Sequence, residues 1–340
     1  MRQIEKTNKK GILRKLLIKL CRLLGYELID QADMSFVTSL NNKNASIIGN
    51  KSITLPLGEI KIKRKIQSLD IILKTCTSVN LVTQNKKRIF ESKKSEYTFR
   101  TLNSLIKSLK KASAEVDKIK FQITVIDAGS SEKDIEKIRE IIKKSNFEFN
   151  IIKLNLDDYL SRIKVIEKNN TQIENNMKST MASIIKSFEL SKNANDLVYF
   201  VEDDYLHNID SILEMISVYE KFSTILEDEV FIVPVDYPYL YQKNQSTNIL
   251  VGKKYHWRFI KESLLTFLTS KKMIDKYYND LIKMGEVEHE PYETILHKIY
   301  DKEKCFSPIP SLALHCTNVN SIFGLSPTLN FQKLWNDNEI

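Results

Sequence analysis

Residues 197–204, Leu-Val-Tyr-Phe-Val-Glu-Asp-Asp, constrain the fold of this chain more than any other stretch. Five consecutive apolar residues, most of them β-branched or aromatic, are typical of a strand that is buried on both faces. The run ends abruptly in three carboxylates, Glu202, Asp203 and Asp204. The pattern therefore predicts a core strand with an acidic carboxyl end.

Three adjacent carboxylates repel one another, and burial at a strand end would raise their pKa values and oppose ionisation. A divalent cation relieves this repulsion, because hard ions such as Mg²⁺ or Mn²⁺ take oxygen ligands. The alternative is a solvated acidic turn that follows a core strand. The segment alone leaves both interpretations open.

Strand and helix patterns alternate along most of the chain. Short apolar runs typical of buried strands are separated by stretches in which apolar residues recur at helical spacing. The alternation predicts βαβ units and an α/β fold with a doubly wound, mostly parallel sheet flanked by helices. The expected strands lie at 69–73, 121–126, 151–154, 197–201 and 230–235.

Polar clusters follow three of these strands, at Lys74–Ser78, Asp127–Ser131 and Glu202–Asp204. Ligands of open α/β sheets bind outside the carboxyl ends of the strands. Since the three clusters would share one edge of the sheet, they predict a site of nucleotide size at that edge.

Two of the strand ends resemble motifs of the GT-A fold glycosyltransferases, which use nucleotide-sugar donors. Val125–Ser131, Val-Ile-Asp-Ala-Gly-Ser-Ser, is similar to the V-(V/I)-D-(D/N)-G-S motif of the large bacterial inverting group, family 2. Phe200–Asp204 looks like the E-D-D form of the DxD motif of such enzymes. The resemblance covers about residues 68–325, and the order and interval of the two motifs suit the fold.

The resemblance implies roles for residues at matching positions. Asp127 would accept a hydrogen bond from the nucleotide base, Asp204 would bind Mn²⁺ or Mg²⁺, and Glu202 would hold the ribose or a metal-bound water. The ion would then bridge the donor diphosphate and neutralise the leaving group. Ala128 departs from the family's usual acidic or amide residue, which leaves the base open, although a UDP-sugar is the commonest donor.

The remaining nucleotide contacts are expected from Asp203 and from the first polar cluster. Asp203 occupies the variable middle position of the E-D-D motif. Thr75 and Thr77 follow the first expected strand and would lie on the same edge of the sheet.

The acidic stretch Glu286–Glu293 is the only other dense acidic cluster after this motif. An inverting transferase needs a carboxylate that takes the proton of the acceptor hydroxyl, and in the resembling family this base often lies at the start of a helix. Pro291 fits a first helical turn, so Glu290, followed by Glu288, is the expected catalytic base. The alternative is that these acids simply favour a helix N-terminus.

His315 follows a short apolar segment late in the chain. Many metal-dependent GT-A enzymes use a late His as a further metal or diphosphate ligand, so the resemblance implies that role for His315. A hydrogen-bonded structural His is the alternative. A zinc site from His315, Cys305 and Cys316 lacks the usual four-ligand spacing.

Residues 9–25 predict a basic amphipathic helix, with leucines on one face and Lys and Arg on the other. Such a helix either lies on an anionic membrane surface or packs its leucines on the main domain. The expected domains are an extension and linker at 1–66, a GT-A domain at 67–325 with a nucleotide-binding half at 67–205 and an acceptor half at 206–325, and a tail at 326–340.

The net charge of +9 raises nucleic acid as a partner. The Lys residues are scattered, however, with 43 acidic residues among them, so we expect solvated surface and no nucleic acid. The longest apolar run has five residues, far short of a membrane span. Four cysteines without a CxxC pair favour a cytoplasmic setting, with peripheral contact at the inner membrane face through the N-terminal helix.

Together these features predict a metal-dependent, inverting glycosyltransferase that moves a sugar to a glycan or lipid-linked acceptor in surface polysaccharide synthesis. One alternative is a nucleotidyltransferase on a similar sheet, although the chain has only eight glycines and no glycine-rich loop. The other is a non-catalytic, nucleotide-binding interaction protein.

Overall fold

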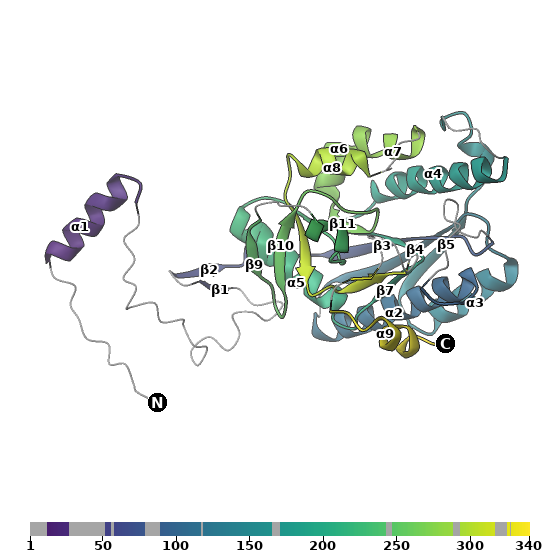
Figure 1. Cartoon of the computed structure of the whole chain (residues 1–340), viewed down its shortest axis with the longest axis horizontal. Helices are drawn as coiled ribbons and strands as arrows, with labels where there is room; N and C mark the ends of the chain where they lie inside the picture. Colours follow the sequence, from purple (N-terminus) through teal and green to yellow (C-terminus); the bar gives the residue numbers. More distant parts are fainter. Residues whose placement is uncertain are drawn as a thin grey trace.

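The computed structural model has a central sheet of nine strands in its described residues (Figure 1). Across the sheet these are β5 (Glu148–Lys153), β4 (Lys120–Asp127), β3 (Ser68–Thr75), β6 (Leu197–Glu202), β11 (Phe267–Ser270), β8 (Phe231–Ile232), β12 (Cys305–Ile309), β10 (His256–Ile260) and β9 (Ile249–Val251). The structure describes residues 12–26, 52–55, 58–78, 89–116, 118–164, 171–242, 247–287, 293–316, 325–326 and 328–340.

The two halves of the sheet differ in strand direction. β5, β4, β3 and β6 are all parallel, as the strand-helix alternation predicts. From β6 onward the neighbours are antiparallel, except that β8 and β12 run parallel. The predicted α/β class is confirmed, and the sheet is mixed.

Helices cover both faces of the sheet (Figure 1). One layer contains α2 (Lys94–Glu115), α3 (Glu132–Lys143), α5 (Ser211–Leu226) and α9 (Phe331–Asp337). The other contains α4 (Thr171–Ser191), α6 (Lys271–Leu281), α7 (Lys283–Glu286) and α8 (Thr294–Tyr300). Two short 3₁₀ turns lie at Leu156–Asp158 and Pro238–Gln242.

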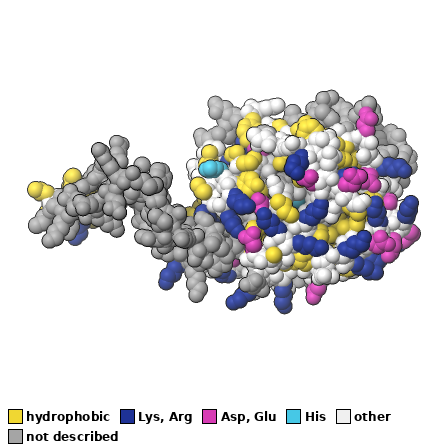
Figure 2. Space-filling model, turned by 90° about the horizontal axis from the view of Figure 1, so that it is seen from below, with side chains coloured by type: hydrophobic (Ala, Val, Ile, Leu, Met, Phe, Trp, Pro, Cys, Tyr) yellow, Lys and Arg dark blue, Asp and Glu magenta, His cyan; other side chains and the backbone are white. Residues whose placement is uncertain are grey.

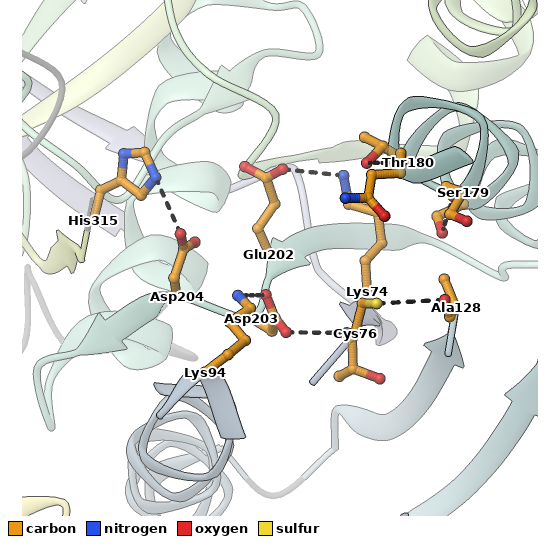
Figure 3. Close-up of a pocket in the computed structure, with 13 residues that line it drawn as sticks. Lys74, Cys76, Lys94, Ala128, Ser179, Thr180, Glu202, Asp203, Asp204 and His315 are labelled. Atoms are coloured by element: carbon orange, nitrogen blue, oxygen red, sulfur yellow. Dashed lines mark hydrogen bonds and ion pairs between the residues drawn. The ribbon is translucent and has the colours of Figure 1, made fainter. Parts of the chain in front are cut away.

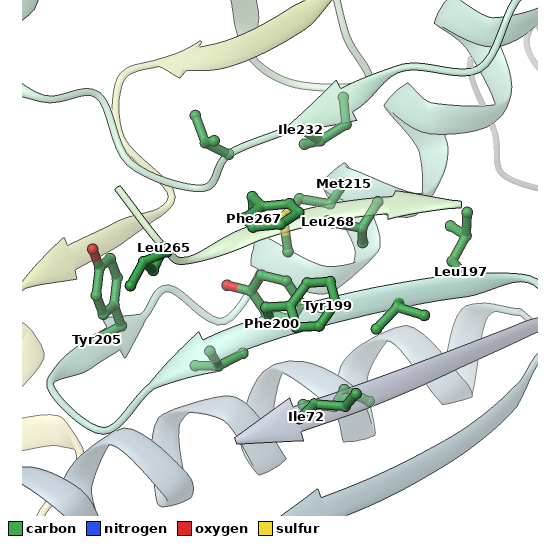
Figure 4. Close-up of a cluster of buried hydrophobic side chains, with 14 of the residues drawn as sticks. Ile72, Leu197, Tyr199, Phe200, Tyr205, Met215, Ile232, Leu265, Phe267 and Leu268 are labelled. Atoms are coloured by element: carbon green, nitrogen blue, oxygen red, sulfur yellow. The ribbon is translucent and has the colours of Figure 1, made fainter. Parts of the chain in front are cut away.

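β6 is the buried central strand that the sequence predicts, and its first five residues are all buried. The ring of Phe200 lies 4.9 Å from that of Phe267 in β11 and 5.1 Å from that of Phe188 in α4 (Figure 4). The hydroxyl of Tyr199 lies 2.6 Å from Nε2 of the buried His207. Each fully buried aromatic of this kind contributes about 2–3 kcal/mol through removal of its apolar surface from water.

Two segments differ from expectation. The apolar run 230–235 forms a strand only at β8, because Pro234 lacks the N–H group that a ladder requires. Its carbonyl accepts from the backbone N–H groups of Leu312 and Ala313 instead. The expected tail at 326–340 contains helix α9, which begins where the side chain of Asn330 accepts from the N–H of Lys333 at 2.9 Å.

The N-terminal residues form helix α1 (Ile12–Leu23), as expected, and a small hairpin of β1 (Ser52–Leu55) and β2 (Gly58–Lys61). The α1 leucines do not pack on the main domain: Leu13 is 85% exposed and Leu16 is 60% exposed. Within the described residues, no helix combines the length and apolar character needed to cross a membrane. Over the face seen in Figure 2, Lys and Arg side chains are interspersed with acidic and apolar ones.

Candidate active site at the carboxyl edge of the parallel strands

A cavity of about 220 Å³ lies at the carboxyl ends of β3 and β6 (Figure 3). The strand register explains how distant residues meet there, because Lys74 lies opposite Glu202 and Thr75 lies opposite Asp127. The three predicted polar clusters therefore share one edge. Helix α4 supplies a polar wall on the other side of the cavity, made of Asn176, Ser179, Thr180 and Ser183.

Asp204 and His315 come together outside the main sheet. Asp204 directly precedes β7 (Tyr205–His207), which pairs antiparallel with β13 (Ala313–His315). Nε2 of His315 lies 3.6 Å from Oδ2 of Asp204, and both side chains are mostly buried. The imidazole stacks on the ring of Tyr205 with centroids 4.5 Å apart, which fixes its orientation beside the carboxylate.

Asp203 is held by structural contacts. Its carboxylate forms an ion pair with Lys94 at the start of α2, and it accepts from the hydroxyl of Thr98 at 2.8 Å and from the N–H of Cys76 at 3.1 Å. The residue thus ties the end of β3 to the first turn of α2. Its expected contact with a nucleotide stays a prediction.

Glu202 pairs with Lys74 across neighbouring strands, at 3.3 Å between Oε1 and Nζ. The backbone N–H of Glu202 donates to the hydroxyl of Thr266, which fixes the end of β6. Both charged groups line the cavity, so the pair offers a donor and an acceptor to a polar ligand.

Asp127 is buried and organises the loop after β4. Its carboxylate accepts from the hydroxyl of Thr75 at 3.0 Å and from the N–H groups of Gly129 and Ser130. Gly129 has a φ of +122°, a conformation that side chains rarely adopt. Thr77 donates from its hydroxyl to Asp134 in α3 at 2.7 Å. The expected contacts of Asp127, Thr75 and Thr77 with a nucleotide stay predictions.

Glu293 is the residue that sequence reasoning missed. It immediately precedes α8 and is 9% exposed. Burial raises the pKa of this carboxyl to about 7, the charge of Glu202 acts in the same direction, and Lys74 and His315 oppose it. Glu293 therefore lies within electrostatic reach of Glu202, Lys74 and His315, although it does not line the cavity itself.

A signal for Glu293 was present in the sequence, because it is the last acid of the 286–293 stretch and stands directly before a helix. The expected bases, Glu288 and Glu290, lie outside the described residues. Their role remains a prediction.

The donor set at Asp204 and His315 fits a divalent cation that also binds a substrate. Among the side chains that the structure describes, no group of three His, Cys, Asp or Glu residues is arranged to hold a metal ion by itself. Mg²⁺ commonly binds through one or two carboxylates and takes its other ligands from water and substrate phosphates. One carboxylate and one imidazole match that kind of site.

No family model matches the sequence, and the search of curated proteins finds no similar sequence. Solved structures with a similar arrangement include the galactosyltransferase LgtC in complex with donor and acceptor sugar analogues, at 14% identity and a TM-score of 0.37, covering 68% of this chain and 70% of that one. S. aureus TarS residues 1–349 align at 12% identity and a TM-score of 0.34, covering 62% of this chain and 49% of that one.

A UDP-glucose pyrophosphorylase complexed with UDP-glucose aligns at 11% identity and a TM-score of 0.39, covering 80% of this chain and 98% of that one. All three TM-scores are below 0.5, so these likenesses carry no conclusion about the activity of this chain.

Proposed function

We propose that this chain is a metal-dependent glycosyltransferase that moves a sugar from a nucleotide-sugar donor to a glycan or lipid-linked acceptor. One observation carries the proposal: Asp204, His315 and the Lys74–Glu202 pair line one cavity at the carboxyl edge of the parallel strands, and the buried Glu293 lies within reach of their charges. This edge is where α/β sheets bind their ligands. A UDP-sugar is the favoured donor because it is the commonest one in the family that the motifs resemble.

Asp204 and His315 would hold Mn²⁺ or Mg²⁺. The bound ion would neutralise charge on the diphosphate leaving group. Lys74 and Glu202 offer an ammonium and a carboxylate next to it, which suit a phosphate oxygen and a ribose hydroxyl or a metal-bound water. The hydroxyl and amide groups of α4 face the same cavity and suit the sugar.

Glu293 would be the base of an inverting reaction. A buried carboxylate with a pKa of about 7 is half ionised at neutral pH, which suits a group that takes a proton from an acceptor hydroxyl. It directly precedes α8, in the half of the chain expected to bind the acceptor. Glu290 and Glu288 stay the alternative candidates.

Helix α1 would bring the enzyme to the inner face of a membrane. Its leucines are exposed, and the helical spacing of the sequence places Lys19 and Arg22 off the leucine face. An amphipathic helix of this kind binds anionic lipid by combining apolar burial with charge attraction. A glycan or lipid-linked acceptor for surface polysaccharide would be reached there.

A thermal-shift panel tests the donor and the metal together. UDP-, GDP- and CMP-sugars are added with Mn²⁺ or with EDTA, and the matching donor is expected to raise the melting temperature only with Mn²⁺ because it binds the folded state alone. The proposal fails if no nucleotide sugar stabilises the protein in either condition.

Turnover separates the remaining alternatives. Slow release of UDP and free sugar from the stabilising donor supports a glycosyltransferase. Release of pyrophosphate from a nucleoside triphosphate indicates a nucleotidyltransferase, and binding without turnover indicates a non-catalytic nucleotide-binding protein.

A further inference from the structure

The pair of Asp204 and His315 depends on a part of the fold that is weak by itself. The two residues lie at one end of the two-stranded sheet of β7 and β13, which is separate from the nine-stranded sheet. The ladder continues to the N–H of Cys316, which donates to the carbonyl of Asp204 at 2.7 Å. Because an isolated two-stranded ribbon is only marginally stable in water, other elements must hold these residues in place.

The two faces of this ribbon have different neighbours. Tyr205 and His315 are paired and stack with each other on the face toward the cavity. Leu206 and Leu314 are the next pair and point to the opposite face, since side chains alternate along a strand. Both leucines are fully buried in a small cluster that is separate from the main core.

That cluster is closed by Trp335 of α9. The indole stacks on the ring of Phe90 with centroids 4.0 Å apart and lies 4.8 Å from the ring of Tyr97 in α2. Trp335 is 6% exposed. The C-terminal helix therefore covers the outer face of the ribbon that carries Asp204 and His315.

Side chains on one face of α2 hold the carboxyl end of α9 through hydrogen bonds. Arg100 donates to the carbonyl of Trp335 at 2.7 Å and places its guanidinium 4.4 Å from the indole centroid. Asn103 donates to the carbonyl of Asn338 at 3.2 Å, and Lys107 donates to that of Asp337. Carbonyls at a helix end lack intrahelical partners and carry partial negative charge, so these contacts suit their acceptors. A helix of seven residues is not stable alone, and its position depends on this docking.

We propose that Trp335 is a positioning residue for the active site: docking of α9 on α2 fixes the ribbon and thereby the separation of Asp204 and His315. The inference rests on the proposed function for its meaning in catalysis. Trp335 contacts no substrate in this account. It acts through Leu206 and Leu314 on the strands that carry the two ligands.

The test compares two tryptophans. Trp335→Ala removes the cover of the ribbon, and Trp335→Phe keeps an aromatic ring there. Trp257→Phe is the matched control, because Trp257 is also buried but packs against Phe222 in the main core, outside the cluster that Trp335 closes. Arg100→Met is a milder second variant, which keeps Trp335 and removes the hydrogen bond to its carbonyl.

Two readouts are needed. The first is the affinity for UDP with Mn²⁺ by calorimetry. The second needs no metal: the ring signals of ¹³C-labelled His315 in the EDTA-treated protein, assigned with His315→Gln, report its stacking on Tyr205 through the ring current.

We expect Trp335→Ala to weaken binding of UDP with Mn²⁺ by about tenfold and to shift the His315 signals. Trp335→Phe should restore both to within about twofold of the wild type, and Arg100→Met should give a smaller change in the same direction. Trp257→Phe should lower the melting temperature and leave both readouts unchanged. If Trp335→Ala does not fold, the comparison of Arg100→Met with Trp257→Phe decides.

The inference is wrong if Trp335→Ala, or Arg100→Met in its place, leaves the affinity and the His315 signals as in the wild type. It is also wrong if Trp257→Phe changes them equally, since general destabilisation would then explain the effect. If the wild type binds no UDP, the nucleotide that the thermal-shift panel identifies replaces it, and a wild type that binds none of UDP, GDP and CMP with Mn²⁺ overturns the proposed function instead. The His315 signals still decide whether α9 positions the ribbon.

Discussion

Charged residues cluster at both ends of strand β6, but the carboxylates at the two ends differ in how they are paired. At the amino end, Arg64 donates to Asp196 and to Glu229, and the hydroxyl of Tyr219 donates to Glu229 at 2.7 Å. Burial raises the pKa of Glu229, but Tyr219 and Arg64 outweigh it, and that pKa lies below its usual value. At the carboxyl end, burial and the charge of Glu202 raise the pKa of Glu293 to about 7.

The difference separates structural charges from those available for chemistry. Carboxylates at the amino end are paired with an arginine and accept hydrogen bonds, so they hold segments of the fold together. At the carboxyl end the carboxylates are not fully neutralised by the positive charges beside them. Such an arrangement is typical of sites that bind a cation or exchange a proton. The sequence shows acids at both ends, and only their partners tell the two kinds apart.

The largest expected effect is the loss of the proposed metal ligand, Asp204, at the carboxyl end. Asp204→Asn keeps the shape of the side chain and removes the charge that a cation needs. We expect turnover of the nucleotide sugar to fall about 10³-fold, which corresponds to about 4 kcal/mol. Initial rates at several Mn²⁺ concentrations measure it. Asp275→Asn, on the exposed side of α6, is the matched control and should keep full activity.

At the amino end we expect a loss of stability instead of a loss of turnover. Arg64→Met leaves Asp196 and Glu229 without their shared cation. Breaking a largely buried pair of this kind costs about 3 kcal/mol of unfolding free energy. Urea titration measures the loss, and the donor affinity of the folded protein should stay unchanged. Lys63→Met is the control, because Lys63 pairs with Glu227 on the surface and should cost less than about 0.5 kcal/mol. Equal losses for both variants would contradict this picture of the amino end.

Because the pKa of Glu293 is raised, we expect the unfolding free energy of the metal-free protein to depend on pH. Its pKa is raised on folding, so the folded state keeps the proton while the unfolded state ionises from about pH 4.5 upward. The unfolding free energy should therefore fall as pH rises toward 7, by on the order of 3 kcal/mol, and level off above that.

Glu293→Gln removes this dependence. The variant should equal the wild type near pH 4.5 and exceed its stability at pH 8, while transferase activity is lost. Urea titrations in EDTA at both pH values measure the difference. A wild-type stability that instead rises between these pH values would show that Glu293 is compensated as Glu229 is.

The smallest effect concerns Asp203, which is anchored in the manner of the amino end although it stands beside Asp204. Thr98→Val removes one hydrogen bond to its carboxylate and should cost about 1 kcal/mol of unfolding free energy, with donor affinity within about twofold of the wild type. Thr101→Val, on the same helix, is the control. The hydroxyl of Thr101 is buried and has no hydrogen-bond partner among the described residues, so its loss should be neutral or stabilising.

The sequence by itself determined the parts of the fold that depend on local pattern. The apolar run at 197–201 and the strand-helix alternation gave a central strand in an α/β sheet, since burial on both faces and periodicity are encoded by neighbouring residues. The same reasoning placed three polar clusters on one edge, because parallel strands end together. It predicted too long a strand at 230–235, where Pro234 interrupts the ladder. It also missed α9, because the stability of that short helix depends on docking against α2, far away in the sequence.

Only the tertiary structure decided which partners each carboxylate has. Asp203 is held by Lys94 and Thr98, Asp204 meets His315 through the pairing of β7 with β13, and the buried Glu293, before α8, feels the charge of Glu202. Each of these relations joins residues far apart in the chain, and the state of a carboxylate depends on burial and on nearby charges in space. The sequence fixes which acids are present, and their partners across the fold determine their chemistry.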